Sequence, residues 1–187
     1  REVKVNESYQ PKYTVTDTRM QIWLNEPLAA QGGKTNVSIH FEFTVPEYGT
    51  DRMGRLNTKN GIVYEIAQWF PRMAVYDDIN GWNTMPYVGA GEFYLEYGDF
   101  DFNITAPGNL ILVGSGELLN PGECYTAEQM TRWEKARKSD ATVMIRSANE
   151  VTNKNSRAAA KEITWRFRIK NSRDVAWAAS RAFVQDA

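Results

Sequence analysis

The stretch TNVSIHFEFTV, residues 35–45, has the most regular pattern in the chain. Apolar side chains occupy every second position from Val37 to Val45, and polar side chains occupy the positions between them. Successive side chains of a β-strand point to opposite faces of its sheet, so this alternation predicts a strand with one buried and one wet face. The stretch therefore indicates a β-rich fold.

Similar alternation recurs along the rest of the chain. It predicts strands at residues 12–16, 19–24, 62–66, 110–118, 141–146 and 162–169, and across 91–106 with a change of phase at Gly98-Asp99. Residues 47–61 are polar and show no periodicity, which predicts a loop. Strands separated by short turns favour an antiparallel sandwich over alternating β-α-β units.

One helix is expected, at residues 126–138. Thr126 and Gln129 have the spacing of a capping box, in which a hydroxyl and an amide side chain satisfy the free N–H groups at the start of a helix. A chain of 187 residues has a length that one domain accommodates. The predicted fold is all-β: a single β-domain over residues 1–187, built as an antiparallel β-sandwich with one short helix.

Composition excludes several classes of function. Lys and Arg number 22 and Asp and Glu number 23, so the net charge of −1 produces no field that favours nucleic acid or an anionic membrane. The sequence contains no apolar run long enough for a membrane span. It begins without an initiator Met or an apolar signal stretch, so we expect a chain cut from a longer one. Cys124 is the only cysteine, which excludes an internal disulfide.

The single histidine restricts the possible catalytic chemistry. His40 and Glu42 fall on one face of the predicted strand, but a catalytic zinc needs three protein ligands and no third is evident. Cys124 precedes the predicted helix, whose N-terminus would lower a thiol pKa, yet no second histidine is present to activate the thiol. We therefore expect a surface histidine, a structural thiol and no metal or cofactor in this chain.

Residues 64–97 concentrate the aromatic side chains. Five Tyr, two Trp and two Phe lie there among glycines and prolines, in a run that is mostly loop-like. Rigid aromatic side chains beside turns are typical of protein interfaces and of carbohydrate sites, where rings stack on sugar faces. Two interpretations follow: packing in the core or against another domain, or a free-standing carbohydrate- or protein-binding module that uses Trp69, Trp82 and Tyr87.

Clustered carboxylates offer a third interpretation, a glycosidase acid/base pair. Adjacent aspartates in the string Tyr-Asp-Asp-Ile-Asn-Gly more often form an Asx turn or a calcium-like loop, although the full calcium-loop pattern is not present, so we favour a structural role. The carboxylate residues concerned are Asp77, Asp78, Glu92, Glu96, Asp99 and Asp101.

Six segments carry a family resemblance. They are residues 68–78 (QWFPRMAVYDD), 81–84 (GWNT), 91–101 (GEFYLEYGDFD), 102–107 (FNITAP), 113–118 (VGSGEL) and 173–180 (RDVAWAAS). Together they resemble the non-catalytic N-terminal β-domain of bacterial gluzincin aminopeptidases, of the aminopeptidase N and leukotriene hydrolase type. Arg72 replaces the cysteine of the family's Phe-Pro-Cys-x-Asp-x-Pro segment, so the chain looks like a divergent, Bacteroidetes-like branch. The family's β-domain begins further upstream, so the chain resembles the latter part of it.

The resemblance implies that this chain is inactive alone. The family's zinc motif lies in the domain that follows, so zinc belongs to the catalytic domain of the parent enzyme. The implied partners are that catalytic domain, in the same polypeptide, and peptide substrates. The family also implies export to the periplasm or the cell surface.

The resemblance further implies a set of site residues. In related enzymes a glutamine and nearby residues of this domain reach the free amino end of the substrate, and carboxylates neutralise such an ammonium group. The positions here are Glu65, Gln68, Asp77 and Asp78, with Trp69, Phe70, Trp82 and Tyr87 as an aromatic surface toward the next domain.

Overall fold

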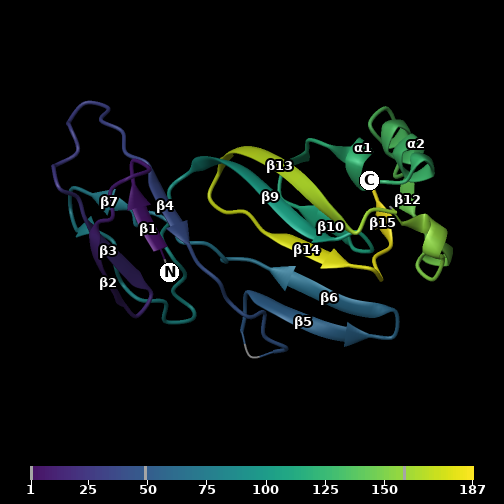
Figure 1. Ribbon diagram of the computed structural model, residues 1–187, viewed down its shortest axis with the longest axis horizontal. Coiled ribbons are helices and arrows are strands. Elements are labelled where there is room, and N and C mark those ends of the chain that lie inside the picture. Colours follow the sequence, from purple (N-terminus) through teal and green to yellow (C-terminus); the bar gives the residue numbers. More distant parts are fainter. Residues whose placement is uncertain (1, 49, 158) are drawn as a thin grey trace. The chain divides into compact units, whose positions relative to one another are not determined.

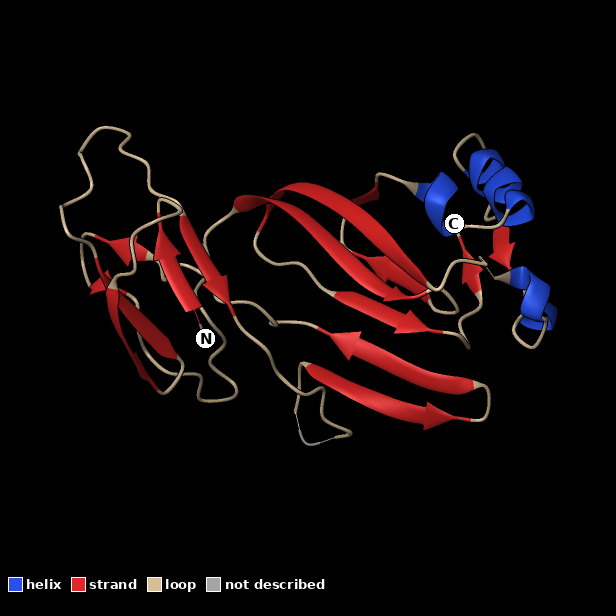
Figure 2. Cartoon of the chain, viewed as in Figure 1, coloured by secondary structure: helices blue, strands red, loops and turns tan. Residues whose placement is uncertain are grey.

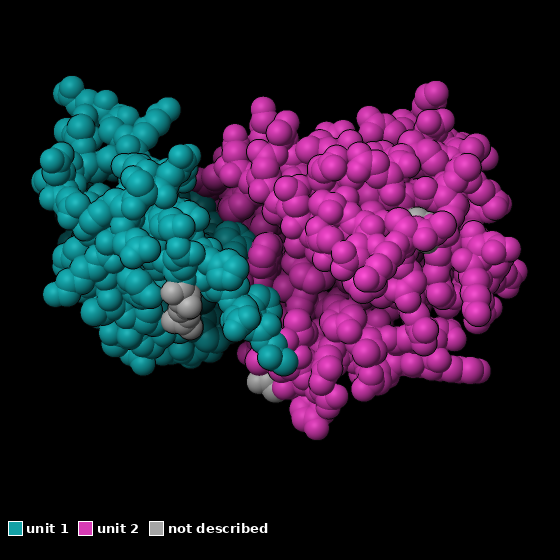
Figure 3. All heavy atoms as spheres, in the orientation of Figure 1, with its two compact units in different colours: residues 1–44, 70–96 teal, residues 45–69, 97–187 magenta. Residues whose placement is uncertain are grey.

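The computed structural model describes residues 2–48, 50–157 and 159–187. Strands predominate over helices, and each pairing between named strands is antiparallel (Figure 2), so the expected all-β class is confirmed. The Cα positions divide into unit 1, Arg1–Thr44 and Phe70–Glu96, and unit 2, Val45–Trp69 and Tyr97–Ala187 (Figure 3). Within the described residues, no helix has the length and apolar character that crossing a membrane requires.

Unit 1 consists of small two-stranded sheets. Its buried apolar side chains, among those described, are Val3, Val5, Pro11 and Val75. Two strands paired alone are marginal in water, so this unit contains little independent core. The pairs are β1 (Glu2–Val5) with β4 (Val37–His40), β2 (Lys12–Thr16) with β3 (Arg19–Trp23), and β7 (Tyr76–Asp77) with β8 (Gly81–Trp82).

Strand β4 has the predicted alternation but not the predicted length. Val37 and Ile39 are half-buried, while Ser38 and His40 are exposed. The strand ends at His40, which pairs with Glu2 at the start of β1. The prediction of a strand over residues 35–45 is therefore wrong beyond His40, and no residue in the described part of the chain forms a ladder with positions 41–45.

Unit 2 contains the larger sheets. One has the strand order β10-β14-β6-β5 and another the order β11-β13-β9, and a third pair joins β12 to β15. The strands are β5 (Met53–Thr58), β6 (Gly61–Ile66), β9 (Gly98–Pro107), β10 (Ile111–Gly114), β11 (Glu117–Leu118), β12 (Met144–Arg146), β13 (Glu162–Ser172), β14 (Trp177–Ser180) and β15 (Gln185–Asp186).

The longest pairing joins β9 to β13, which lie side by side in Figure 1. Their inward face is aromatic: Phe102 pairs with Phe167, their rings stack with centroids 5.1 Å apart, and Trp165 is fully buried. Their outward face is charged, with the Arg168 guanidinium 2.6 Å from Asp101. The period of two that the sequence displays thus separates core from solvent, as expected for a strand buried on one face.

Two glycines determine how the chain returns from β9. A Cβ added to Gly114 would lie 3.2 Å from the Phe167 ring, so β10 contacts the aromatic face of β13 here. Gly116 has a φ of +88°, a conformation that favours glycine. The continuous strand predicted at residues 110–118 is therefore wrong: it breaks here into β10, which pairs with β14, and β11, which pairs with β13.

The predicted helix is confirmed as α2 (Ala127–Ala136). Gln129 N–H donates to the Thr126 hydroxyl at 3.3 Å, and Thr126 N–H donates to the Gln129 side chain at 3.2 Å, which completes the capping box. The structure also contains a short α1 (Pro121–Cys124) and two 3-10 helices, η1 (Ala148–Glu150) and η2 (Lys154–Ser156), that the alternation pattern did not predict.

Two further predictions differ from the structure. The loop predicted at residues 47–61 contains β5, whose polar side chains lie at a sheet edge where hydrogen bonds to β6 stabilise the strand. The strand predicted from residue 91 begins at Gly98, the position of the predicted change of phase, and the β9–β13 register shifts at the same place. Its first seven residues form no strand.

Arg146 lies fully buried on β12, and its guanidinium donates only to backbone carbonyls. Nη1 reaches Arg181 at 3.1 Å and also Phe183, whereas Nη2 reaches Glu150 at 3.4 Å and Val151 at 3.5 Å. Burial lowers the pKa of Arg146 from its ordinary value. The side chain fastens the C-terminal segment to the turn around η1.

Replacing Arg146 with Met should destabilise the fold strongly. Buried carbonyls that lose their donors cost roughly 1–3 kcal/mol each, so we expect a loss of about 3 kcal/mol. The measurement is urea unfolding followed by circular dichroism. The matched control is Arg168→Met, which breaks an exposed ion pair and should cost less than about 1 kcal/mol. Equal losses in the two variants would contradict this assignment.

Cys124 and Tyr125 form a buried pair at the end of α1. Burial raises the pKa of the Cys124 thiol to about 12, assisted by the charge of Glu123. Burial also raises the pKa of Tyr125 to about 12. The Tyr125 ring meets the Trp165 ring edge-on with centroids 5.4 Å apart, so the pair belongs to the core.

In the folded protein, Cys124 should not react with a thiol reagent at pH 8, because the thiol is buried. After unfolding in denaturant, the same thiol should react fully. A folded thiol that reacts as fast as free cysteine would refute the assignment.

Burial of Cys124 and Tyr125 also makes the stability of the fold depend on pH. Both folded-state pKa values are raised, so their contribution to stability is complete below the ordinary values of 9 and 10 and is lost as pH rises toward 12.

Candidate functional site

The residues predicted from the aromatic run belong to different units. Glu65, Gln68 and Trp69 lie in unit 2, at and after the end of β6. The other five lie in unit 1 and are Phe70, Asp77, Asp78, Trp82 and Tyr87. Each group is therefore a separate local environment.

In unit 1, the β7–β8 hairpin presents an aromatic pair. Tyr76 faces Trp82 across the two strands, and their rings meet edge-on at 5.2 Å with an interplanar angle of 70°. Tyr76 is 62% exposed, Trp82 is 55% exposed, and Ile79 in the turn is 87% exposed. The hairpin thus leaves three large apolar side chains in solvent.

Asp77 organises the turn of this hairpin. One carboxylate oxygen accepts the N–H groups of Ile79 at 3.0 Å and Asn80 at 2.6 Å. This is the Asx turn that the sequence favoured, and it commits the Asp77 carboxylate to the backbone. Asp78 is exposed and has no hydrogen bond or ion pair among the described residues.

The other two predicted aromatic residues of unit 1 are more enclosed. Tyr87 is half-buried, its ring lies 5.4 Å from that of Phe93, and its N–H donates to the Thr18 hydroxyl at 3.4 Å. Phe70 is half-buried beneath the Arg72 guanidinium at 5.7 Å. Of the predicted aromatic residues in this unit, Trp82 is therefore the exposed one.

In unit 2, Glu65 lies on an open stretch of sheet. It is exposed on β6, and its neighbours on the adjacent strands are Gly54 and Ala178, whose side chains are absent or small. Gln68 is half-buried with a φ of +49°. Trp69 is half-buried and its indole N–H donates to the Val175 carbonyl at 3.3 Å. Of these three, only Glu65 presents its functional group openly.

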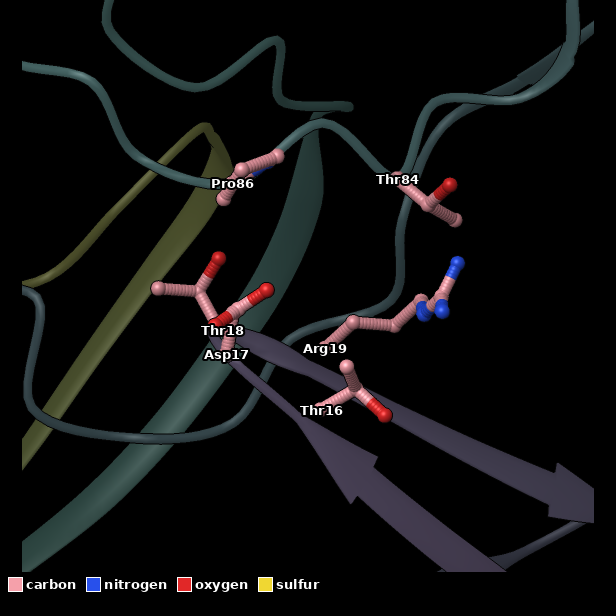
Figure 4. Close-up of a pocket in the computed structure, with 6 residues that line it drawn as sticks. All are labelled: Thr16, Asp17, Thr18, Arg19, Thr84 and Pro86. Atoms are coloured by element: carbon pink, nitrogen blue, oxygen red, sulfur yellow. The ribbon is translucent and has the colours of Figure 1, made fainter.

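A hollow lies beside the β2–β3 turn in unit 1 (Figure 4). Its volume is about 120 Å³, whereas sites for drug-sized ligands occupy roughly 300–1,000 Å³. It is too small and too open to hold more than a few water molecules or a single polar group. Its lining residues are Thr16, Asp17, Thr18, Arg19, Thr84 and Pro86.

The other residues that the sequence offered for catalysis have structural roles. Asp99 accepts the Asn171 N–H at 2.9 Å, and Asp101 is paired with Arg168. Cys124 is buried, and its raised pKa is the opposite of the lowering expected at a helix N-terminus. Across residues 2–48, 50–157 and 159–187, no three His, Cys, Asp or Glu side chains are grouped to hold a metal ion.

Sequence reasoning missed the most exposed apolar residues of this region. Besides Tyr76 and Ile79, they include Met73 at 72%, Met85 at 74% and Val88 at 68% exposure. Their signal in the sequence is the placement of apolar residues directly beside turn residues, without the period of two that would bury them. Exposed apolar residues of this kind are typical of an interaction surface and not of a catalytic cleft.

Comparisons with known proteins add no relationship to this geometry. No model of a protein family matches the chain, and no curated protein or solved structure matches it either.

Proposed function

We propose that this chain is the non-catalytic N-terminal β-domain of a zinc-dependent aminopeptidase of the gluzincin type. In that role it packs on the catalytic domain of the same polypeptide and shapes the entrance for peptide substrates. Export to the periplasm or cell surface belongs to the same proposal. The proposal is based on the resemblance of six sequence segments. The structural observation that supports it is the exposed aromatic hairpin of unit 1.

The finer fold is part of this proposal. We infer that the two larger sheets of unit 2 pack face to face as a β-sandwich. The close approach of Gly114 to the Phe167 ring supports this, because the two residues belong to different sheets. Alternating inward aromatic side chains on β9 and β13 are those that a sandwich core requires.

The segments that carry the resemblance include surface features against which another domain could pack. Residues 68–78 include the turn that leaves β6 and the first strand of the hairpin. Large apolar side chains left in solvent are costly for an isolated protein and are typical of a surface that another protein covers. Tyr and Trp are also the residues most enriched where binding energy concentrates.

Glu65 is the position best suited to a substrate's α-ammonium group. Its side chain is exposed, and the residues that pair with it on the neighbouring strands, Gly54 and Ala178, have no side chain or a small one. Asp77 is less suited, since its carboxylate already accepts two backbone N–H groups. A charge-assisted hydrogen bond to the ammonium group is the interaction we assign to Glu65.

The alternative is a free-standing carbohydrate- or protein-binding module. Sugar stacking needs flat, accessible ring faces, and the edge-on arrangement of Tyr76 and Trp82 offers no coplanar platform. Trp69 is half-buried with its N–H bonded to Val175, and Tyr87 lies against Phe93. These contacts favour a protein partner over a glycan. Saturable glycan binding by the purified chain would reverse that preference.

The gene sequence downstream of Ala187 tests the proposal directly. We expect a His-Glu-x-x-His motif, the zinc site of such peptidases, within roughly the next two hundred residues. A stop codon at that point, or a glycosidase domain in place of the peptidase, would refute the proposal.

In the parent enzyme, Glu65→Gln should raise KM for aminoacyl substrates about tenfold and leave kcat nearly unchanged, because it removes an interaction made equally in the ground and transition states. The measurement is steady-state kinetics on unblocked substrates. Glu162→Gln, which removes another exposed carboxylate of unit 2, is the control and should behave as wild type. An unchanged KM in Glu65→Gln would eliminate the substrate role of Glu65 without refuting the domain assignment.

A further inference from the structure

The tip of the β7–β8 hairpin combines apolar exposure with one unneutralised charge. We call Tyr76, Asp78, Ile79 and Trp82 the hairpin patch. Its three apolar members are between 55% and 87% exposed, and Asp78 is exposed beside them. Scattered exposed apolar residues need no explanation, but these three lie within one hairpin, in which Tyr76 and Trp82 pair and their rings are in contact.

The patch is held in a defined conformation. The Asp77 carboxylate fixes the turn by accepting two N–H groups, and the rings of Tyr76 and Trp82 support each other edge-on. Asn83 N–H continues the ladder by donating to the Val75 carbonyl at 2.7 Å, and Val75 is buried. A preorganised surface loses less conformational entropy when it binds, which is how rigid aromatic anchors gain affinity.

The stretch of chain that contains the patch has charge of a single sign, although Arg19 lies near Thr84, two residues after Trp82. Residues 73–97 contain four acidic residues and no Lys or Arg, although the chain as a whole has 22 basic residues. A partner that covers Ile79 and Trp82 would also remove water from the Asp78 carboxylate. A desolvated carboxylate is costly unless a cationic group pairs with it. The partner must therefore supply positive charge around an apolar contact.

We propose that the hairpin patch docks in an apolar pocket rimmed by Lys or Arg on a protein partner. This rests on the proposed function only in taking a protein as the partner. A second copy of this chain is disfavoured, because its own patch would bring a second carboxylate to the contact. Membranes with anionic lipid are disfavoured for the same electrostatic reason.

The test uses the full 187-residue chain and two synthetic amphipathic helical peptides as probes, one of Leu and Lys and one of Leu and Glu. Fluorescence anisotropy of labelled peptide measures binding. We expect the Leu-Lys peptide to bind at least roughly tenfold more tightly than the Leu-Glu peptide, and added salt to weaken that binding. Ile79→Ser and Trp82→Ser should each weaken it about tenfold, since each removes an apolar anchor. Asp78→Lys should reverse the preference between the two peptides.

The matched control is Leu56→Ser, which alters an aliphatic side chain of unit 2 that is 66% exposed, and it should bind as wild type. Ile79→Ser is the variant least able to disturb folding, and circular dichroism of each variant checks this. The proposal is overturned if the patch variants bind as wild type or if Leu56→Ser loses as much affinity. Dimerisation abolished by Ile79→Ser, seen by light scattering, would overturn it in favour of a second copy. Peptide binding does not involve a peptidase domain, so its failure is distinct from failure of the proposed function.

Discussion

The antiparallel pairing of β9 with β13 is the constraint on which most of unit 2 depends. It places Phe102 and Phe167 on one face and the Arg168–Asp101 pair on the other. The free edge of β13 then receives β11, and the Asn120 side chain, just before α1, donates to the Thr164 carbonyl at 2.8 Å and accepts the Arg166 N–H at 3.0 Å. A single long ladder thus orients its neighbouring strand and the first helix.

Local pattern predicted the elements that local forces determine. The strands at residues 12–16 and 62–66 and the Thr126–Gln129 capping box depend on alternation or on contacts within a few residues, and the structure contains them. The register of β4 depends instead on its pairing with β1, and the break at Gly116 depends on two sheets that require different partners. β5 was missed because a polar edge strand gains its stability from hydrogen bonds to β6, which its composition does not reveal.

The same division holds for the candidate site. The sequence identified the region in which aromatic and acidic residues concentrate, and it favoured an Asx turn at Asp77-Asp78. It did not predict that Tyr76 and Trp82 lie opposite each other, or that the Trp69 N–H is bonded to a carbonyl more than a hundred residues away. Those facts come from strand register and long-range packing. The structure thus distinguishes the exposed carboxylates of Glu65 and Asp78 from that of Asp77, which accepts two backbone N–H groups.

Unit 1 explains why an exposed apolar surface can persist in this chain. Its described core is small, with Val3, Val5, Pro11 and Val75 as its buried apolar residues, while Tyr76, Trp82 and Ile79 remain in solvent. Stability in such a unit comes from turns and short ladders more than from burial. The Asp77 carboxylate fixes the hairpin turn by accepting two N–H groups, so the turn beside the aromatic pair is set by local hydrogen bonds. A complementary partner that covered this surface would remove the cost of its exposure and leave the turn intact.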